Sequence, residues 1–86
     1  MPNWNVKISK KAEKQFNSFP AKDQRLILKI LDAMAVYPFG GDLVRLRNER
    51  SEWRRRVGNY RIFFDVYSQI KVVDVVGIER RTSNTY

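Results

Sequence analysis

Apolar and polar residues alternate near the start of the chain, and the spacing then becomes helical. Between Asn5 and Ser9 apolar and polar residues alternate, which predicts a first strand. Ser9 is a suitable N-cap, and the apolar residues after it predict a short helix that ends near Ser18. Residues 21–37 carry the clearest helical pattern, with six apolar positions expected to form one buried face: Leu26, Ile27, Ile30, Leu31, Met34 and Ala35.

Helix-breaking residues at positions 38–42 separate these helices from a second half with β character. Alternation and β-branched residues predict strands at residues 43–47, 52–57, 60–67 and 70–78, and Gly58-Asn59 is typical of a two-residue hairpin turn. The valine-rich last strand is expected to be the central one. The predicted order is β-α-α-β-β-β(-β), a single α+β domain over residues 1–86. Two helices pack on one face of a small, twisted, mostly antiparallel sheet.

The excess of basic residues indicates that the protein binds a negatively charged partner. The 86 residues include 17 Lys and Arg against 9 Asp and Glu, a net charge of +8, which favours a polyanion or an acidic protein as partner. Ten basic residues fall in the second half, residues 44–86, and nine of these are arginines. Planar guanidinium groups suit bidentate binding of phosphate better than lysine does. The arginine-rich strands are therefore the expected binding surface.

Location follows from what the chain lacks. There is no cysteine, the first residues contain no apolar run suited to a signal peptide, and nothing approaches the length of a membrane span. We therefore expect a soluble, cytoplasmic protein without a membrane partner.

The period of two assigns the arginines to faces of the sheet. Trp53 and Val57 are the apolar members of their strand and should face the helices, so Arg54 and Arg56 should share the opposite face, about 7 Å apart. The hairpin then brings Arg61 back beside Arg56. A cluster of guanidinium groups with aromatic neighbours suits a nucleic-acid backbone and its bases.

The direction of four other side chains in the two hairpin strands can also be predicted. Arg55 should point toward the helices, so we expect it at the sheet edge or paired with an acid. Trp53 and Phe64 are expected in the core. Phe63 shares a face with Arg61 and can either pack or stack on a base.

Histidine is absent, which removes the usual general acid–base and the commonest metal ligand. The nine carboxylates show no metal-site spacing, and no glycine-rich phosphate loop is present. Any chemistry must therefore use Arg, Lys, Tyr, Ser, Thr or a single carboxylate, and we expect no metal and no cofactor.

Three segments resemble the RelE/ParE superfamily of bacterial toxin–antitoxin toxins: residues 38–46, the hairpin at 53–64 and the tail at 79–86. The resemblance covers essentially the whole chain, and the hairpin is its most specific part. RelE-like members are endoribonucleases that cut messenger RNA in the ribosomal decoding site and are neutralised by a cognate antitoxin. ParE-like members share the fold but poison DNA gyrase. The chain is identified as a RelE-like member, and this implies an mRNA interferase that inhibits translation.

The resemblance also implies roles for particular residues. RelE-like enzymes use basic residues at alternate positions before the hairpin, an arginine after it, an arginine after the last strand and a C-terminal tyrosine. Matching these to this sequence gives four candidate catalytic residues: Arg56, Arg61, Arg81 and Tyr86. The spacing also allows Arg80 in place of Arg81, and the tyrosine of the family acts as a general base or as a stacking residue. The expected RNA contacts are Arg45, Arg47, Arg54, Arg80 and Phe63. Two departures are that the strand positions are arginine instead of lysine, and that the interval from Gly77 to Tyr86 differs by about one residue.

Several alternatives stay open at this point. The general base is Tyr86 or one of three carboxylates, Asp42, Glu49 and Glu52, and the general acid is not fixed. The activity is ribonucleolytic, or else the chain is a gyrase-binding toxin or a degenerate toxin that only binds its antitoxin. The expected partners are a cognate acidic antitoxin, in a heterodimer or larger complex, and messenger RNA on the ribosome. Operator DNA is expected to bind only through the antitoxin.

Overall fold

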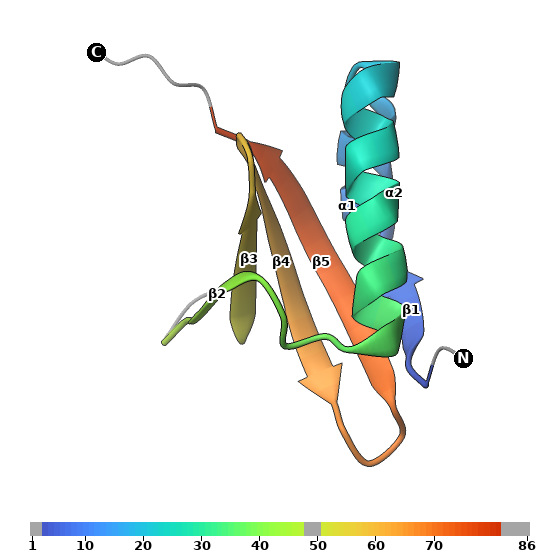
Figure 1. The fold of residues 1–86 in the computed structure, drawn as a ribbon, viewed down its shortest axis with the longest axis vertical. Helices are drawn as coiled ribbons and strands as arrows, with labels where there is room; N and C mark the ends of the chain where they lie inside the picture. Colours follow the sequence, from blue (N-terminus) through green and yellow to red (C-terminus); the bar gives the residue numbers. More distant parts are fainter. Residues whose placement is uncertain (1–2, 48–50, 82–86) are drawn as a thin grey trace.

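Two helices lie against one face of a five-stranded sheet in the computed structural model, which describes residues 3–47 and 51–81 (Figure 1). The predicted α+β fold is therefore confirmed, including the additional strand after the helices. The elements are β1 (Asn5–Ile8), α1 (Lys10–Asn17), α2 (Ala21–Val36), β2 (Asp42–Arg45), β3 (Trp53–Val57), β4 (Tyr60–Tyr67) and β5 (Val72–Arg80).

The strand order in the sheet is β1-β5-β4-β3-β2, and only the β1–β5 pair is parallel. The prediction that the last strand is central was wrong, because β4 occupies the middle and β5 lies between β4 and β1. β5 also starts later than predicted, at Val72, because Lys71 adopts a left-handed backbone conformation (φ 55°) in the turn before it. It extends to Arg80, which pairs with Tyr60.

Helix α1 covers the edge of β5 where β1 ends. Ser9 caps the helix as predicted, because its Oγ accepts a hydrogen bond from the Ala12 N–H at 3.1 Å. The parallel ladder ends at the pair Ile8–Val75, and beyond it the Gln15 Oε1 accepts a hydrogen bond from the Ile78 N–H at 2.7 Å. A side chain of α1 thus replaces the missing strand and satisfies a backbone donor that β1 does not reach.

Helix α2 contributes a narrow stripe to the core. Ile27, Leu31 and Met34 are buried against the sheet, whereas Leu26 is 40% exposed, so its predicted burial was wrong. Successive helix residues are rotated by about 100°, which places Leu26 at the border of the contact with the sheet. Among the described residues no helix is both long and apolar enough to cross a membrane.

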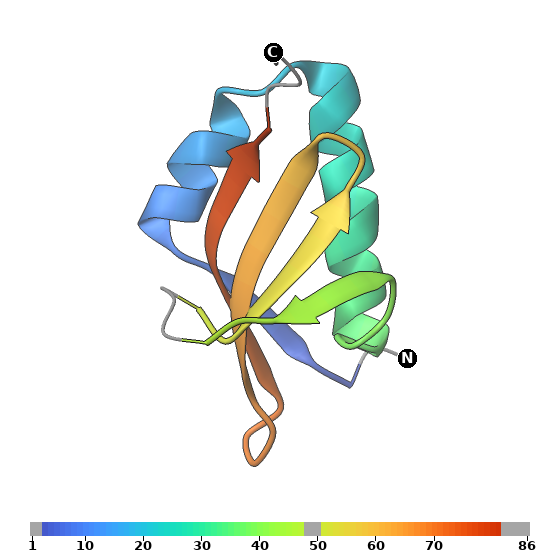
Figure 2. The same ribbon diagram turned by 90° about the vertical axis from the view of Figure 1, so that its left-hand side faces the viewer.

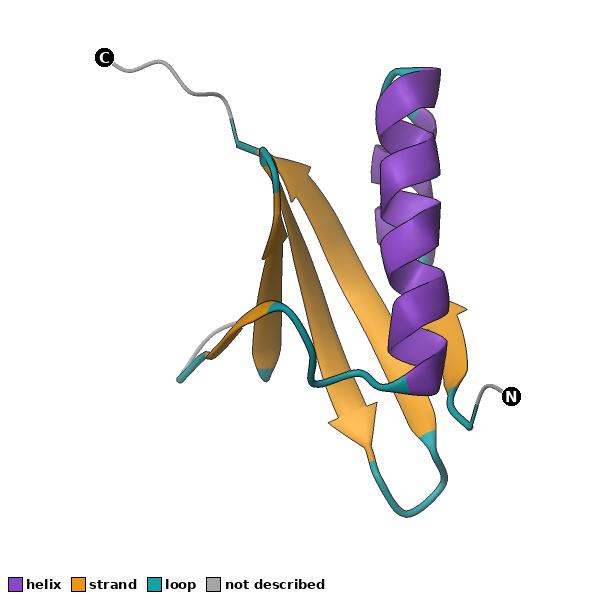
Figure 3. Cartoon of the chain, in the orientation of Figure 1, coloured by secondary structure: helices purple, strands orange, loops and turns teal. Residues whose placement is uncertain are grey.

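The sheet has a second face that the helices leave uncovered, called the open face below. In Figure 2 this face is turned toward the viewer and both helices lie behind the sheet, and Figure 3 shows the same two layers from the side. Trp53 and Val57 pack against the core on the helix side, as predicted. Because side chains alternate along a strand, Arg54 and Arg56 belong to the open face.

Candidate nucleic-acid interface

Three arginines from neighbouring strands meet on the open face. Arg54 and Arg56 come from β3 and Arg61 from β4, and the register places Arg56 directly opposite Arg61. The Cβ atoms of directly opposite residues in an antiparallel pair lie roughly 5 Å apart. The predicted position of these three residues on one face of the sheet is confirmed, and they are called the arginine patch below.

The arginine patch is part of a charged row that crosses four strands. From β2 to β5 the paired residues are Asp42, Arg56, Arg61 and Glu79. Two like charges in the centre repel each other, and an acid flanks each of them on the outer side. Asp42 makes an ion pair with Arg56, with 3.3 Å between the Oδ2 and Nε atoms. The row therefore places two arginines side by side on the open face of the sheet.

The stems of two patch arginines lie close to the sheet. The Nε atoms of Arg54 and Arg61 are buried and have no hydrogen-bond partner among the described residues. Phe63 lies opposite Arg54 and is only 4% exposed, since its ring packs near Gly77, where no side chain stands in the way. This burial favours packing over base stacking for Phe63. Because the Nε atoms of Arg54 and Arg61 are shielded from solvent, a phosphate would have to be bound by the terminal Nη atoms of these side chains.

Arg55 lies on the interior strand β3, opposite Leu43 of the edge strand β2, and its guanidinium extends to the start of that edge strand. The guanidinium lies against Gly41, close enough that a Cβ on this glycine would be 2.6 Å from the Arg55 Nε. Gly41 also has a φ of +77°, a left-handed conformation that glycine adopts most readily. Partial burial lowers the pKa of Arg55 from its ordinary value, although a guanidinium stays charged at neutral pH. Arg55 therefore supports the loop before β2 and does not join the patch.

The two arginines of the β2 region lie elsewhere. Arg45 is paired with Trp53 in the sheet, so it belongs to the helix side, with its guanidinium 5.6 Å from the Trp53 ring centroid. Its Nη2 also lies 3.5 Å from the Glu52 Oε2. Arg47 follows β2 at this same end, away from the hairpin turn. The fold does not bring these two residues to the arginine patch, and their RNA contacts stay predictions.

The end of β5 separates the two arginines that the sequence left as alternatives. Arg80 pairs with Tyr60 on the helix side, and its guanidinium carbon is 6.0 Å from the Tyr60 ring centroid. The Arg81 N–H donates a hydrogen bond to the Asn59 carbonyl in the hairpin turn, beside the strand ends that carry Arg56 and Arg61. Of the two, Arg81 is not paired to the helix side, and its backbone is bound to the hairpin turn that joins the two patch strands.

Tyr60 anchors this end of the sheet to the helices. Its hydroxyl donates a hydrogen bond to the Asp23 Oδ2 at 2.6 Å, and its ring contacts Phe19. Burial, followed by the hydrogen bond to Asp23, raises the pKa of Tyr60 above its ordinary value. Tyr60 is thus a neutral donor with a structural role.

The four candidate general bases are Tyr86, Asp42, Glu49 and Glu52, and the described ones differ in whether they lie near the arginine patch. Tyr86 and Glu49 lie outside the described residues. Glu52 is turned to Arg45, and its backbone N–H is bound by Asp65. Asp42 alone among the described candidates contacts a patch arginine. Its position depends on the register of β2 against β3, which no local sequence pattern indicates.

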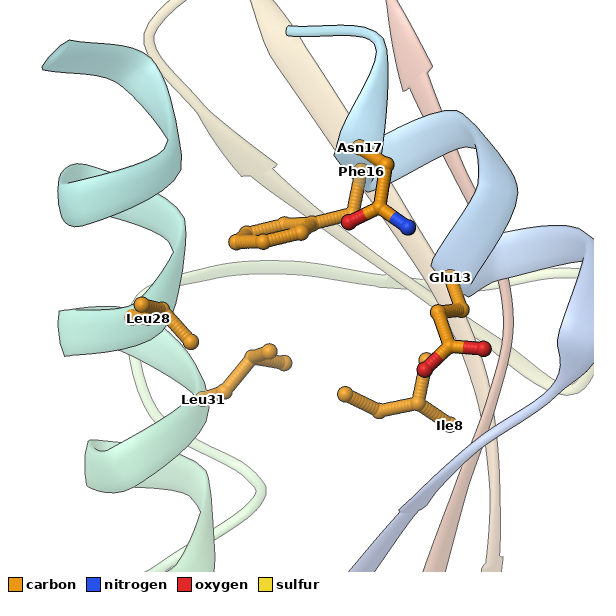
Figure 4. A pocket seen from close by; sticks show the side chains of 6 residues that line it. All are labelled: Ile8, Glu13, Phe16, Asn17, Leu28 and Leu31. Atoms are coloured by element: carbon orange, nitrogen blue, oxygen red, sulfur yellow. The ribbon is translucent and has the colours of Figure 1, made fainter. Parts of the chain in front are cut away.

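A separate hollow of about 160 Å³ lies on the helix side, between β1, α1 and α2 (Figure 4). It is lined by Ile8, Glu13, Phe16, Asn17, Leu28 and Leu31. Its lining is mainly apolar with one titratable group, and this suits packing against a partner better than catalysis. Among the described residues no group of three or more His, Cys, Asp or Glu side chains is placed to hold a metal ion.

Comparison with known proteins gives a family match over nearly the whole chain. Residues 6–84 match the family model of the ParE toxin of the type II toxin–antitoxin system, parDE. No curated protein is matched significantly.

The solved structures similar to this chain include RelE toxins, alone or in complex with an antitoxin. The RelE–RelB complex from the archaeon Pyrococcus horikoshii is matched with a TM-score of 0.81 and 26% identity, over 94% of this chain and 98% of that chain. The toxin–antitoxin complex RelBE2 from Mycobacterium tuberculosis has a TM-score of 0.82 and 17% identity, over 94% and 100% of the two chains. The isolated RelE toxin of E. coli has a TM-score of 0.77 and 16% identity, over 94% and 87%.

Proposed function

We propose that this chain, which belongs to the ParE toxin family of type II toxin–antitoxin systems and has a RelE-like fold, is an endoribonuclease that cleaves messenger RNA. The observation that carries the proposal is the arginine patch, in which Arg56 and Arg61 are directly opposite each other on an exposed sheet face. The proposed place of action is the decoding site of the cytoplasmic ribosome, and the result is inhibition of translation.

The patch supplies what strand cleavage requires. Attack of a ribose 2′-OH on its neighbouring 3′-phosphate breaks the bond to the 5′-oxygen and passes through a phosphorane with extra negative charge. A base must remove the hydroxyl proton and an acid must protonate the leaving oxygen. Guanidinium groups stabilise the added charge, by about 2.7–4 kcal/mol for each well-aimed donor, as for oxyanion-hole donors. The proposed chemistry uses no metal ion.

The proposed roles follow the positions in the fold. Arg56 and Arg61 bind the reacting phosphate, and Arg54, on the same face, holds a neighbouring one. Arg81 is the candidate acid, and Tyr86 is the candidate base. Because phosphate contacts carry no base information, the patch itself tolerates many sequences.

A second candidate function is supported by the family match. The matching family is the ParE family, and the resemblance to ParE-like toxins implies binding to DNA gyrase. Binding to gyrase does not require two guanidinium groups placed against each other for one phosphate. We therefore rank the ribonuclease first and treat gyrase as the alternative.

Induction of this chain alone is expected to stop protein synthesis while DNA synthesis continues at first. Co-expression of the neighbouring antitoxin should restore growth. Pulse labelling with radioactive amino acids and thymidine measures the two rates separately. Early loss of DNA synthesis with intact protein synthesis would favour the gyrase alternative, and no arrest at all would indicate a degenerate toxin.

The proposed partner is an acidic antitoxin that covers the apolar hollow on the helix side and the arginine patch on the open face. The solved P. horikoshii and M. tuberculosis neighbours are toxin–antitoxin complexes, and the net charge of +8 favours an acidic segment. A heterodimer or a larger complex is expected, in which only the antitoxin contacts operator DNA.

The association rate with this antitoxin is expected to fall markedly as salt is raised. Attraction between opposite charges is screened over about 8–10 Å at physiological ionic strength. Stopped-flow measurements of the on-rate at increasing salt concentration provide the test. A rate that does not respond to salt would exclude electrostatic capture and leave apolar packing as the driving force.

A further inference from the structure

We infer that Asp42 is a positioning residue for Arg56, an inference that rests on the proposed ribonuclease function. The Asp42 Oδ2 lies 3.3 Å from the Nε of Arg56 and is paired with it across β2 and β3. A contact at Nε is compatible with binding of a phosphate at the terminal Nη atoms of the same guanidinium. Those atoms are the ones that form the fork for a phosphate group.

The order of the strands determines on which side of Arg56 the carboxylate of Asp42 lies. β3 lies between β2 and β4, so Asp42 and Arg61 are on opposite sides of Arg56. Without the carboxylate, Arg56 would face only a like charge and would be free to turn into solvent. With it, the guanidinium is held beside Arg61, where one phosphate can accept hydrogen bonds from both.

Stability alone does not account for this contact. The side chains of Asp42 and Arg56 are 57% and 54% exposed, and ion pairs between exposed groups contribute little to folding. Asp42 also lies on an edge strand that begins directly after Gly41, whose left-handed conformation (φ 77°) starts the strand at this residue. The loop and the register together place a carboxylate at the β2 position opposite Arg56.

Asp42→Asn is expected to reduce the single-turnover cleavage rate on programmed ribosomes by about 10- to 100-fold, because a small displacement of a catalytic group has effects of this size. The RNA concentration at half-saturation should rise by no more than several-fold, because only the phosphate contact of Arg56 is weakened and Arg54 and Arg61 still bind the RNA. Asp32→Asn, which makes the same charge change at an exposed position of α2, is the matched control and should be neutral. Equal effects of both substitutions would overturn the inference.

A double-mutant cycle separates positioning from other roles. In the Arg56→Ala background, Asp42→Asn should have little further effect, because the group that it positions is absent. Independent, multiplicative losses would overturn the inference. So would a pH–rate profile that loses its acidic limb in Asp42→Asn, since that result would make Asp42 the general base. Asp42→Glu should recover part of the lost rate.

A binding measurement keeps this inference separate from the proposed function. In ¹⁵N-labelled protein the Arg56 Nε–H resonance should move when inorganic phosphate is added, and Asp42→Asn should weaken phosphate binding several-fold at this resonance. If the wild-type chain cleaves no RNA but shows this response, the ribonuclease proposal fails and the positioning role stands. If phosphate affects both proteins equally, the positioning role fails whatever the activity.

Discussion

Arg56→Ala and Arg61→Ala are each expected to lower the single-turnover cleavage rate at least about 100-fold, the size of effect seen when one preorganised donor is removed. Arg56 and Arg61 are directly opposite each other on neighbouring strands, so each is proposed to approach the phosphate from its own side. Loss of one guanidinium therefore leaves a phosphate oxygen without its donor. The rate is measured on programmed ribosomes with toxin in excess. Circular dichroism and the melting temperature verify that each variant folds.

The matched control is Arg25→Ala, which removes the same charge from an exposed position on α2, the layer on the other side of the sheet. It should retain nearly full activity. A control that loses as much activity as the patch variants would show that total charge governs the reaction. Patch variants that keep more than about one tenth of the rate would contradict the proposed role, given the usual size of the effect.

Deletion of Tyr86 is expected to reduce cleavage strongly, by roughly 100-fold for a lost general base. Tyr86→Phe distinguishes the two roles of this residue. The variant should be as inactive as the deletion if the hydroxyl is the base, but only mildly impaired if the ring stacks on a nucleotide base. A guanidinium group close to a tyrosine favours the ionised hydroxyl, which makes the proposed base role chemically reasonable. The same single-turnover assay measures both variants.

A cleavage rate that is unchanged by the deletion would remove the tail from the mechanism. The base would then be sought among the carboxylates Asp42, Glu49 and Glu52. Glu52 is engaged with Arg45 on the helix side, whereas Asp42 touches the patch. The pH–rate profile of Asp42→Asn then decides whether Asp42 orients Arg56 or accepts the proton itself.

The family match and the structural neighbours point to two different branches of the RelE/ParE superfamily. The family model that matches the sequence describes the ParE toxin, whereas the similar solved structures include RelE toxins. One fold supports unrelated activities, so function has to be argued from the site. The arginine patch is the feature that distinguishes the two proposals, and the pulse-labelling experiment tests them directly.

The sequence by itself determined the elements and the two faces of β3. Alternation and helical spacing are local properties, because side chains repeat every two residues in a strand and every 3.6 in a helix. Trp53 and Val57 could therefore be assigned to the core, and Arg54 and Arg56 to the opposite face. The two-residue turn at Gly58-Asn59 also fixed the pairing of Arg56 with Arg61, since a short hairpin leaves one register.

Only the tertiary structure decided how distant segments meet. Residues 46–52 lie between β2 and β3, and a glycine turn lies between α2 and β2, so the partner of Arg56 on β2 could not be deduced from spacing. The middle position of β4, the exposure of Leu26 and the burial of Phe63 near Gly77 likewise depend on which surfaces remain available after the other elements have packed. These contacts join residues that are far apart in the chain. Which of the possible pairings forms depends on the free energy of the whole fold. Local periodicity carries no information about that selection.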